Sequence, residues 1–188
     1  MIPPQATKLF STERTDVYRL TEHFSPAMEI FLKRNRENFT PFEPLRAEDY
    51  FSEAGIRQRI TLSDLDHEAR KSLLLVFTLK DSAEIIGSIN FTNFIYGVFQ
   101  AGHLGFSLDQ EYEGKGFMYE ALSSAMDYVR RQYGLHRIMA NHLADNQRSK
   151  NTLAKLGFVQ EGFARSYLKI NGKWQDHVLN AYVFPEDE

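Results

Sequence analysis

The most constraining feature of the sequence is a short strand that passes through a glycine-containing turn directly into a long one-sided helix. Residues 103–108 have the alternation of a strand, and Gly114 and Gly116 follow in the turn. Beyond the turn, apolar side chains recur with the spacing of one helix face. They are Met118, Ala121, Leu122, Ala125, Met126 and Val129. Because this face has to be covered, we expect the helix to pack on the core of an α/β fold.

Similar patterns predict the other elements. Polar residues 81–84 join two strands as a hairpin, and Asn171-Gly172 is a hairpin turn signal for the last two strands. The expected strands are 17–20, 73–79, 85–91, 103–108, 137–141, 159–170 and 178–184. The expected helices are 25–38, 48–65, the one that Gly134 ends, and 146–156, which Gly157 closes. The order predicts a mixed α/β sheet with helices on both faces, in a single domain over residues 1–188.

Composition narrows the class of protein. The chain has 188 residues, 43% of them hydrophobic, which suits one compact core. A net charge of -3 gives no signal for direct nucleic-acid binding. The absence of cysteine excludes a disulfide scaffold and a Cys acyl-enzyme, and six histidines without ligand spacing give no metal-site signal. No signal peptide or membrane-length apolar run is present, so we expect a soluble cytoplasmic protein without membrane contact.

The glycine turn has the properties of an anion site. The first turn of a helix leaves backbone N–H groups unpaired, and the helix dipole adds positive charge there. Gly114 and Gly116 allow the backbone to approach a phosphate or pyrophosphate closely. The turn lacks the third glycine of a dinucleotide fingerprint and the Lys-Ser/Thr of a P-loop. A simple tight turn is the alternative, with Lys115 either adding a cation or only solvated.

These residues resemble motif A of the GNAT acetyltransferases, Q/R-x-x-G-x-G/A, with Glu111 at the usual Gln/Arg position. Residues 141–158 resemble the family's motif B, in which N-x-x-S opens a helix that ends in L-G-F. The resemblance implies the GNAT fold, with a mostly antiparallel mixed sheet, and acetyl-CoA as cosubstrate without a metal. The cofactor-binding residues that it implies are Phe106, Leu108, Gly114, Lys115, Gly116, Phe117, Asn146 and Ser149.

The resemblance implies different roles for these cofactor-binding residues. The backbone of Phe106 and Leu108 would hold the acetyl carbonyl, and the amides of the glycine turn would bind the coenzyme pyrophosphate. Asn146 would hydrogen-bond the pantetheine arm, or would only cap its helix. With Glu111 in place of Gln or Arg, one favourable charge or donor is lost, so we expect weaker anion binding there.

Other segments resemble the RimJ/RimL type, the ribosomal-protein-alanine N-acetyltransferases. They are 116–122, 136–141, 172–178 and the early Phe42-Glu43-Pro44 loop, and the resemblance covers nearly the whole chain after about Phe24. It implies direct acetyl transfer, in a ternary complex, to the N-terminal alanine of a ribosomal protein, the fifth of the small subunit. The protein N-terminus would be the acceptor, with the ribosome or its precursor as a further contact.

The sequence offers candidates for the general acid and the general base of the transfer. The family's frequent acid, a Tyr seven residues after the motif-B Asn, is replaced by Leu153, so Ser149 becomes the candidate, against an ordinary helical serine. Candidate bases are Glu43, Glu161 and His103. Their alternatives are a surface residue, a strand-capping residue and a structural histidine, respectively.

The acceptor site has its own candidates and alternatives. Phe42, Glu43 and His103 are the candidate substrate-binding residues, and the aromatic side chains of Phe39, Phe42 and Tyr50 either line an acceptor groove or belong to the core. Two further functions stay open: acetylation of a small-molecule amine, and a non-catalytic acetyl-CoA-binding or ribosome-assembly module.

Overall fold

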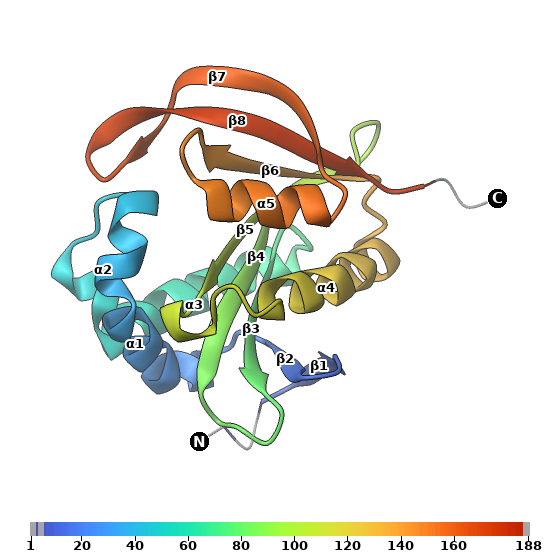
Figure 1. Cartoon of the computed structure of the whole chain (residues 1–188). Coiled ribbons are helices and arrows are strands. Elements are labelled where there is room, and N and C mark those ends of the chain that lie inside the picture. Colours follow the sequence, from blue (N-terminus) through green and yellow to red (C-terminus); the bar gives the residue numbers. More distant parts are fainter. Residues whose placement is uncertain (1–2, 4–5, 186–188) are drawn as a thin grey trace.

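The computed structural model describes residues 3 and 6–185 and shows one eight-stranded sheet in the order β1-β2-β3-β4-β5-β6-β8-β7 (Figure 1). All neighbouring strands are antiparallel except β5 and β6, which are parallel. The strands are β1 (Lys8–Ser11), β2 (Thr15–Arg19), β3 (Leu73–Leu79), β4 (Ile85–Ile95), β5 (Ala101–Leu108), β6 (Arg137–Leu143), β7 (Val159–Ile170) and β8 (Lys173–Val183).

Helices cover both faces of this sheet. The α-helices are α1 (Ser25–Arg34), α2 (Arg36–Phe39), α3 (Glu53–Glu68), α4 (Phe117–Tyr133) and α5 (Gln147–Lys155). The single-turn 3-10 helices are η1 (Glu22–Phe24), η2 (Thr40–Phe42), η3 (Glu48–Phe51) and η4 (Gln110–Tyr112). The predicted mixed sheet with helices on both faces is therefore confirmed. Among the described residues, no helix combines the length and the apolar character needed to cross a bilayer.

Side-chain alternation along β3 divides the core into two layers. Leu73, Leu75 and Phe77 point into the layer that contains the apolar stripe of α4, together with Leu153 of α5. Val76 points to the opposite layer, which contains buried residues of α1 and α3. The apolar run of residues 73–77 in β3 is thus explained by burial on both faces. The α4 stripe read from the sequence is buried along its whole length.

The position of the parallel pair matters most for the site. Strands β5 and β6 are joined through α4, and they pair only over Ala101–His103 and Arg137–Met139. Beyond His103 the two strands separate, while β5 stays paired with β4 as far as Leu108. The separation leaves one edge of β5 without a strand partner, at the end that leads into the glycine turn.

The first predicted helix is interrupted. It was expected to run from 25 to 38, but α1 ends at Arg34 and Asn35 adopts φ -100° and ψ 7° before the short α2. The buried Asn35 side chain donates to the Phe31 carbonyl and to Asp109 Oδ2, at 3.0 and 2.8 Å. A contact with a residue 74 positions away therefore decides where this helix breaks.

Other boundaries also shift. The expected helix 48–65 is divided into η3 and α3, because the Ser52 hydroxyl caps α3 by accepting from Gly55 N at 3.1 Å. Strand β8 begins at Lys173, five residues before the expected start. The reason is that β7 and β8 stay paired as far as the Asn171-Gly172 turn, where Ile170 pairs with Lys173. Strand β1 was missed, and its Leu9 and Phe10 pack on the α4 side of the core.

Two glycines of β5 allow a matched test of the packing. A Cβ on Gly102 would lie 2.6 Å from the ring of the buried Phe94, whereas a Cβ on Gly105 would meet nothing within 4 Å. We expect Gly102→Ala to lower the free energy of unfolding by about 1–3 kcal/mol through overpacking. Gly105→Ala should change it by less than about 0.5 kcal/mol. Urea unfolding of both variants measures the difference, and equal effects would contradict this account of the core.

Candidate active site

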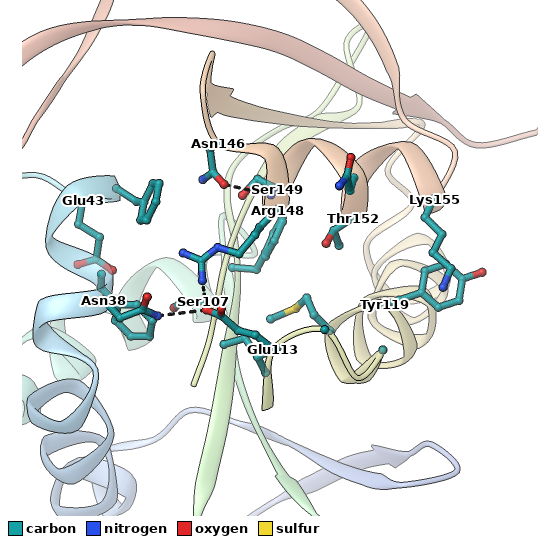
Figure 2. A pocket seen from close by; sticks show the side chains of 18 residues that line it. Asn38, Glu43, Ser107, Glu113, Tyr119, Asn146, Arg148, Ser149, Thr152 and Lys155 are labelled. Atoms are coloured by element: carbon teal, nitrogen blue, oxygen red, sulfur yellow. Dashed lines mark hydrogen bonds and ion pairs between the residues drawn. The ribbon is translucent and has the colours of Figure 1, made fainter. Parts of the chain in front are cut away.

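A cavity of about 420 Å³ opens where β5 leaves β6, between the glycine turn, α2 and α5 (Figure 2). Strand β5, the glycine turn and the first turn of α4 form one side, and α5 with its N-cap forms another. The α2–η2 segment closes the third side. The lining residues are Asn38, Phe39, Phe42, Glu43, Phe106, Ser107, Leu108, Glu113, Gly114, Gly116, Met118, Tyr119, Asn146, Arg148, Ser149, Asn151, Thr152 and Lys155.

The exposed edge of β5 offers backbone groups to this cavity. The amide of Asp109 donates to the Ile86 carbonyl of β4 at 2.8 Å. Because alternate residues of a strand direct their backbone groups to opposite neighbours, Ser107 also faces β4, while Phe106 and Leu108 face the open side. Both are cavity-lining residues. A donor and an acceptor from each of them are therefore available to an extended ligand.

The glycine turn adds the start of a helix to this edge. Gly114 and Gly116 have φ of 71° and 83°, a left-handed conformation that favours glycine. Gly116 is the N-cap of α4, so the first backbone amides of a 17-residue helix point toward the turn. A Cβ on Gly114 would meet nothing within 4 Å, which means that its surface is open to a ligand. These features fit the anion cradle predicted from the sequence.

A buried polar network holds the beginning of the turn. Asp109 is only 1% exposed and pairs with Arg34 Nη2 at 2.5 Å. Its other oxygen, Oδ1, accepts from the Glu111 amide at 2.9 Å, and Asn35 Oδ1 accepts from the Gln110 amide at 3.1 Å. Asn35, which ends α1, thus also positions the turn together with Arg34, and a hydrogen-bonded network of this kind restricts the geometry of the turn.

The α5 side of the cavity begins at Asn146. Its Oδ1 accepts from the Ser149 amide at 3.1 Å, which is the N-cap geometry given as one of two alternatives from the sequence. Asn146 nevertheless lines the cavity, as does Ser149 one turn into the helix. The capping bond uses only Oδ1, so the side-chain nitrogen Nδ2 of Asn146 stays available to donate to a ligand. Both proposed roles are geometrically compatible.

An ion pair crosses the cavity. Arg148 of α5 pairs with Glu113 of the glycine turn, and Asn38 Nδ2 of α2 donates to the same Glu113 oxygen at 3.1 Å (Figure 2). The Arg148 guanidinium also lies over the Phe42 ring, 5.3 Å from its centroid. The pair neutralises a carboxylate that would otherwise repel an anion beside Gly114.

Glu43 is the second carboxylate of the cavity, and its environment differs. Burial raises the pKa of the Glu43 carboxyl above its ordinary value, and Arg46, 3.9 Å away, offsets only part of this. Its backbone carbonyl accepts from the Asn171 amide at 2.8 Å, so the β7–β8 turn holds the loop that carries it. A carboxylate with a raised pKa in a cavity is suited to accept a proton near neutral pH.

Several predicted residues lie outside the cavity. Glu161 is on β7 and pairs with Arg137, half-exposed to solvent. His103 is the last residue of β5 that pairs with β6, and burial lowers its pKa. Lys115 is exposed and bends back to donate to the Glu111 carbonyl at 2.7 Å. The side chain of Phe117 contacts the Tyr112 ring and the Arg14 guanidinium, and it is not among the residues that line the cavity.

Of the aromatic candidates for the acceptor groove, two line the cavity and one does not. Phe42 lines the cavity, and so does Phe39, which also belongs to the buried core. Tyr50 packs beside the same core between Arg46 and Arg59. Leu153, at the position of the family's frequent Tyr, is 1% exposed and buried in the core.

Some cavity residues were missed from the sequence. On α5 they are Arg148, Asn151, Thr152 and Lys155, whose helical spacing is a signal that a search for a polar face would have found. Asn38, Ser107, Glu113 and Tyr119 carry no such local signal. Residues 3 and 6–185 contain no group of three or more His, Cys, Asp or Glu side chains placed to share a metal ion.

Comparison with known proteins supports the same interpretation. The family model of the GNAT acetyltransferase domain matches residues 13–159. The ribosomal protein uS5-alanine N-acetyltransferase of Escherichia coli is 39% identical over 171 residues, which is 91% of this chain and 84% of that protein. A probable N-acetyltransferase of Bacillus subtilis is 38% identical over 155 residues, covering 82% of this chain and 85% of its own length.

A solved structure shows the same fold. The crystal structure of the ribosomal-protein-S5-alanine acetyltransferase from Vibrio fischeri is similar to this chain with a TM-score of 0.88 and 36% identity. The match covers 93% of this chain and 95% of that one. The open β5 edge, the glycine turn and Asn146 fit the thioester arm and pyrophosphate of acetyl-CoA. The chain therefore belongs to the GNAT acetyltransferase family and uses acetyl-CoA as its acetyl donor.

Proposed function

We propose that this protein acetylates the N-terminal alanine of a ribosomal protein, with the small-subunit protein uS5 as the acceptor. The observation that carries the proposal is Glu43, a half-buried carboxylate with a raised pKa in the same cavity as the β5 edge. The support for a ribosomal acceptor is the 39% identity, over 91% of the chain, to an enzyme that is named for uS5 alanine.

The chemistry of the acceptor agrees with this cavity. An α-amino group with a pKa of about 7.7–8.0 is roughly one-tenth neutral near pH 7, whereas a lysine amine at about 10.4 is neutral less than about once in a thousand. A single weakly basic carboxylate is sufficient for the first and poorly matched to the second. Glu43 is such a group, because its pKa is raised by burial but it remains a carboxylate.

The roles of the residues follow from their positions. The amine attacks the acetyl carbonyl of the thioester directly, and its proton passes to Glu43. Backbone N–H groups of Phe106 and Leu108, fixed by the pairing of β5 with β4, donate to the developing oxyanion. From the first turn of α5, the Ser149 hydroxyl relays a proton to the departing thiolate and takes one from solvent in the same step. Most of the acceleration comes from holding amine and thioester in one geometry.

The function is tested with purified protein, acetyl-CoA and synthetic peptides. We expect acetylation of a peptide that begins with the N-terminal sequence of mature uS5, and none of the same peptide with a blocked N-terminus. Spermidine serves as the small-amine competitor. In a deletion strain, mass spectrometry of ribosomal proteins should show one N-terminus that loses an acetyl group. Transfer to spermidine alone, or no transfer with normal coenzyme binding, would overturn the proposal in favour of the other two functions.

Glu43→Gln tests the proposed base through pH dependence. At low pH, kcat/KM of the wild type should rise with a log–log slope of about two, because Glu43 and the acceptor amine both lose a proton. In the variant only the amine titrates, so the slope should fall to about one, and kcat/KM near neutral pH should fall by roughly 10²-fold. Because burial raises the pKa of Glu43, the change of slope that Glu43 causes in the pH profile should lie at higher pH than for an ordinary carboxyl group.

The matched control for this variant is Glu37→Gln, an exposed carboxylate on α2. It should keep the slope of the wild type. An unchanged slope in Glu43→Gln would remove Glu43 from proton transfer, and Glu161 or His103 would then be tested in the same way.

Ser149→Ala tests the proposed acid. We expect kcat to fall by roughly 10²-fold, at the low end of general acid catalysis, while the Kd of acetyl-CoA stays within about twofold. The Asn146 cap is kept, because it uses the backbone amide of residue 149. Stopped-flow or steady-state assays measure kcat, with Ser63→Ala in α3 as control on the other face of the sheet. Turnover equal to that of the wild type would exclude Ser149.

A further inference from the structure

Arg14 connects the N-terminal hairpin to the glycine turn. It lies between β1 and β2, about a hundred residues before the turn in sequence. Its Nη1 donates to the Lys115 carbonyl at 3.0 Å, and its Nε donates to Glu120 Oε2 at 2.6 Å. The guanidinium lies over the Phe117 ring, 4.2 Å from its centroid. One side chain thus contacts the turn and the first turn of α4 together.

Glu120 is itself held in place by the same hairpin. Its Oε1 accepts from the Arg14 amide at 2.7 Å and from the Thr12 hydroxyl. Burial works to raise the pKa of Glu120, but these hydrogen bonds and the Arg14 charge outweigh it, so the pKa lies below its ordinary value. Glu120 is therefore a fixed anion, and it orients the Arg14 guanidinium through a charge-assisted bond.

The turn has little else to hold its second half. Gly114, Lys115 and Gly116 are exposed, and two of the three have no side chain that could anchor them. The Lys115 side chain reaches back to the Glu111 carbonyl and over the Tyr112 ring, both within the same turn. Ordering such a glycine-containing segment on binding costs conformational entropy, which weakens affinity for the ligand. An anchor from outside the turn removes much of this cost.

The geometry also places Arg14 beside the anion site. Its Nη2 lies 3.4 Å from the position that a Cβ of Gly116 would occupy, next to the N-cap of α4. Within the described residues, Nη2 has no hydrogen-bond partner. Glu111 contributes no positive charge or donor at the usual Gln/Arg position of this turn. Arg14 is thus a cation that the tertiary structure brings to the second half of the turn, as Arg148 is at Glu113 in its middle.

We propose that Arg14 is a positioning residue for acetyl-CoA, which fixes the Lys115–Gly116–Phe117 backbone so that its amides face the coenzyme pyrophosphate. It acts on the pyrophosphate end of the coenzyme and not on the thioester or the acceptor amine. This role is independent of the identity of the acceptor.

The test compares ligands with and without the pyrophosphate. In calorimetric titrations Arg14→Ala should weaken CoA by roughly tenfold or more, because a charge-assisted anchor of the turn is lost. Pantetheine, which has the arm but no pyrophosphate, is measured by displacement against CoA and should change by less than about twofold. Arg14→Lys should recover only part of the CoA affinity, because an ammonium cannot bridge Glu120 and the Lys115 carbonyl as the guanidinium fork does.

The control is Arg57→Ala, an exposed arginine of α3 that pairs with Glu53 and Glu22, and it should bind both ligands as the wild type does. Unchanged CoA affinity in Arg14→Ala, or equal loss for CoA and pantetheine, would overturn the proposal. If Arg14→Ala does not fold, Glu120→Gln takes its place, since it weakens the same anchor and should show the same selective loss. These titrations need no acceptor, so they remain decisive if the uS5 assignment fails.

Discussion

The structure depends on the point at which β5 and β6 stop pairing. Parallel pairing ends at His103 and Met139, while β4 on one side and β8 on the other keep both strands in place. Backbone N–H and C=O groups are obligatory hydrogen-bonding groups, so an edge exposed inside a sheet requires a partner. An extended amide-containing arm such as pantetheine can supply one. The unpaired edge of β5 is thereby suited to bind the cosubstrate through backbone hydrogen bonds.

The glycine turn at the end of that edge is held from several directions. Arg34 and Asn35 bind its first residues through buried Asp109, and Arg148 pairs with Glu113 in its middle. Arg14 holds its end. Each anchor comes from a different part of the chain, so the turn is positioned by the assembled fold. A turn that is already ordered binds an anion with a smaller loss of conformational entropy.

Two carboxylates in one cavity have different environments. Glu113 is paired with Arg148 and accepts from Asn38, whereas Glu43 has only Arg46 at 3.9 Å as a charged partner, and desolvation raises its pKa. Separate environments for two acidic groups are a common way to divide roles at a site. In our proposal Glu113 belongs to the frame around the coenzyme, and Glu43 accepts the proton of the acceptor amine. The β7–β8 turn supports this division by holding the backbone of Glu43.

The sequence alone determined the features that depend on neighbours in the chain. These include the strand, glycine turn and α4 in order, the cap of α5 at Asn146, and the turn at Asn171-Gly172. Local backbone preferences and side-chain periodicity produce them, so a reader of one segment can predict them. The family and most cavity residues of the β5 edge and the turn followed from these same segments.

Only the tertiary structure decided the break at Asn35, the partial burial and raised pKa of Glu43, the Arg148–Glu113 pair and the Arg14 anchor. It also placed Glu161 and His103 outside the cavity, although the sequence made them equal candidates with Glu43. The pKa of a carboxyl and the partner of a guanidinium are set by burial and by charges from distant segments. Those surroundings exist only when the chain is folded, because no local pattern encodes which remote side chains will meet.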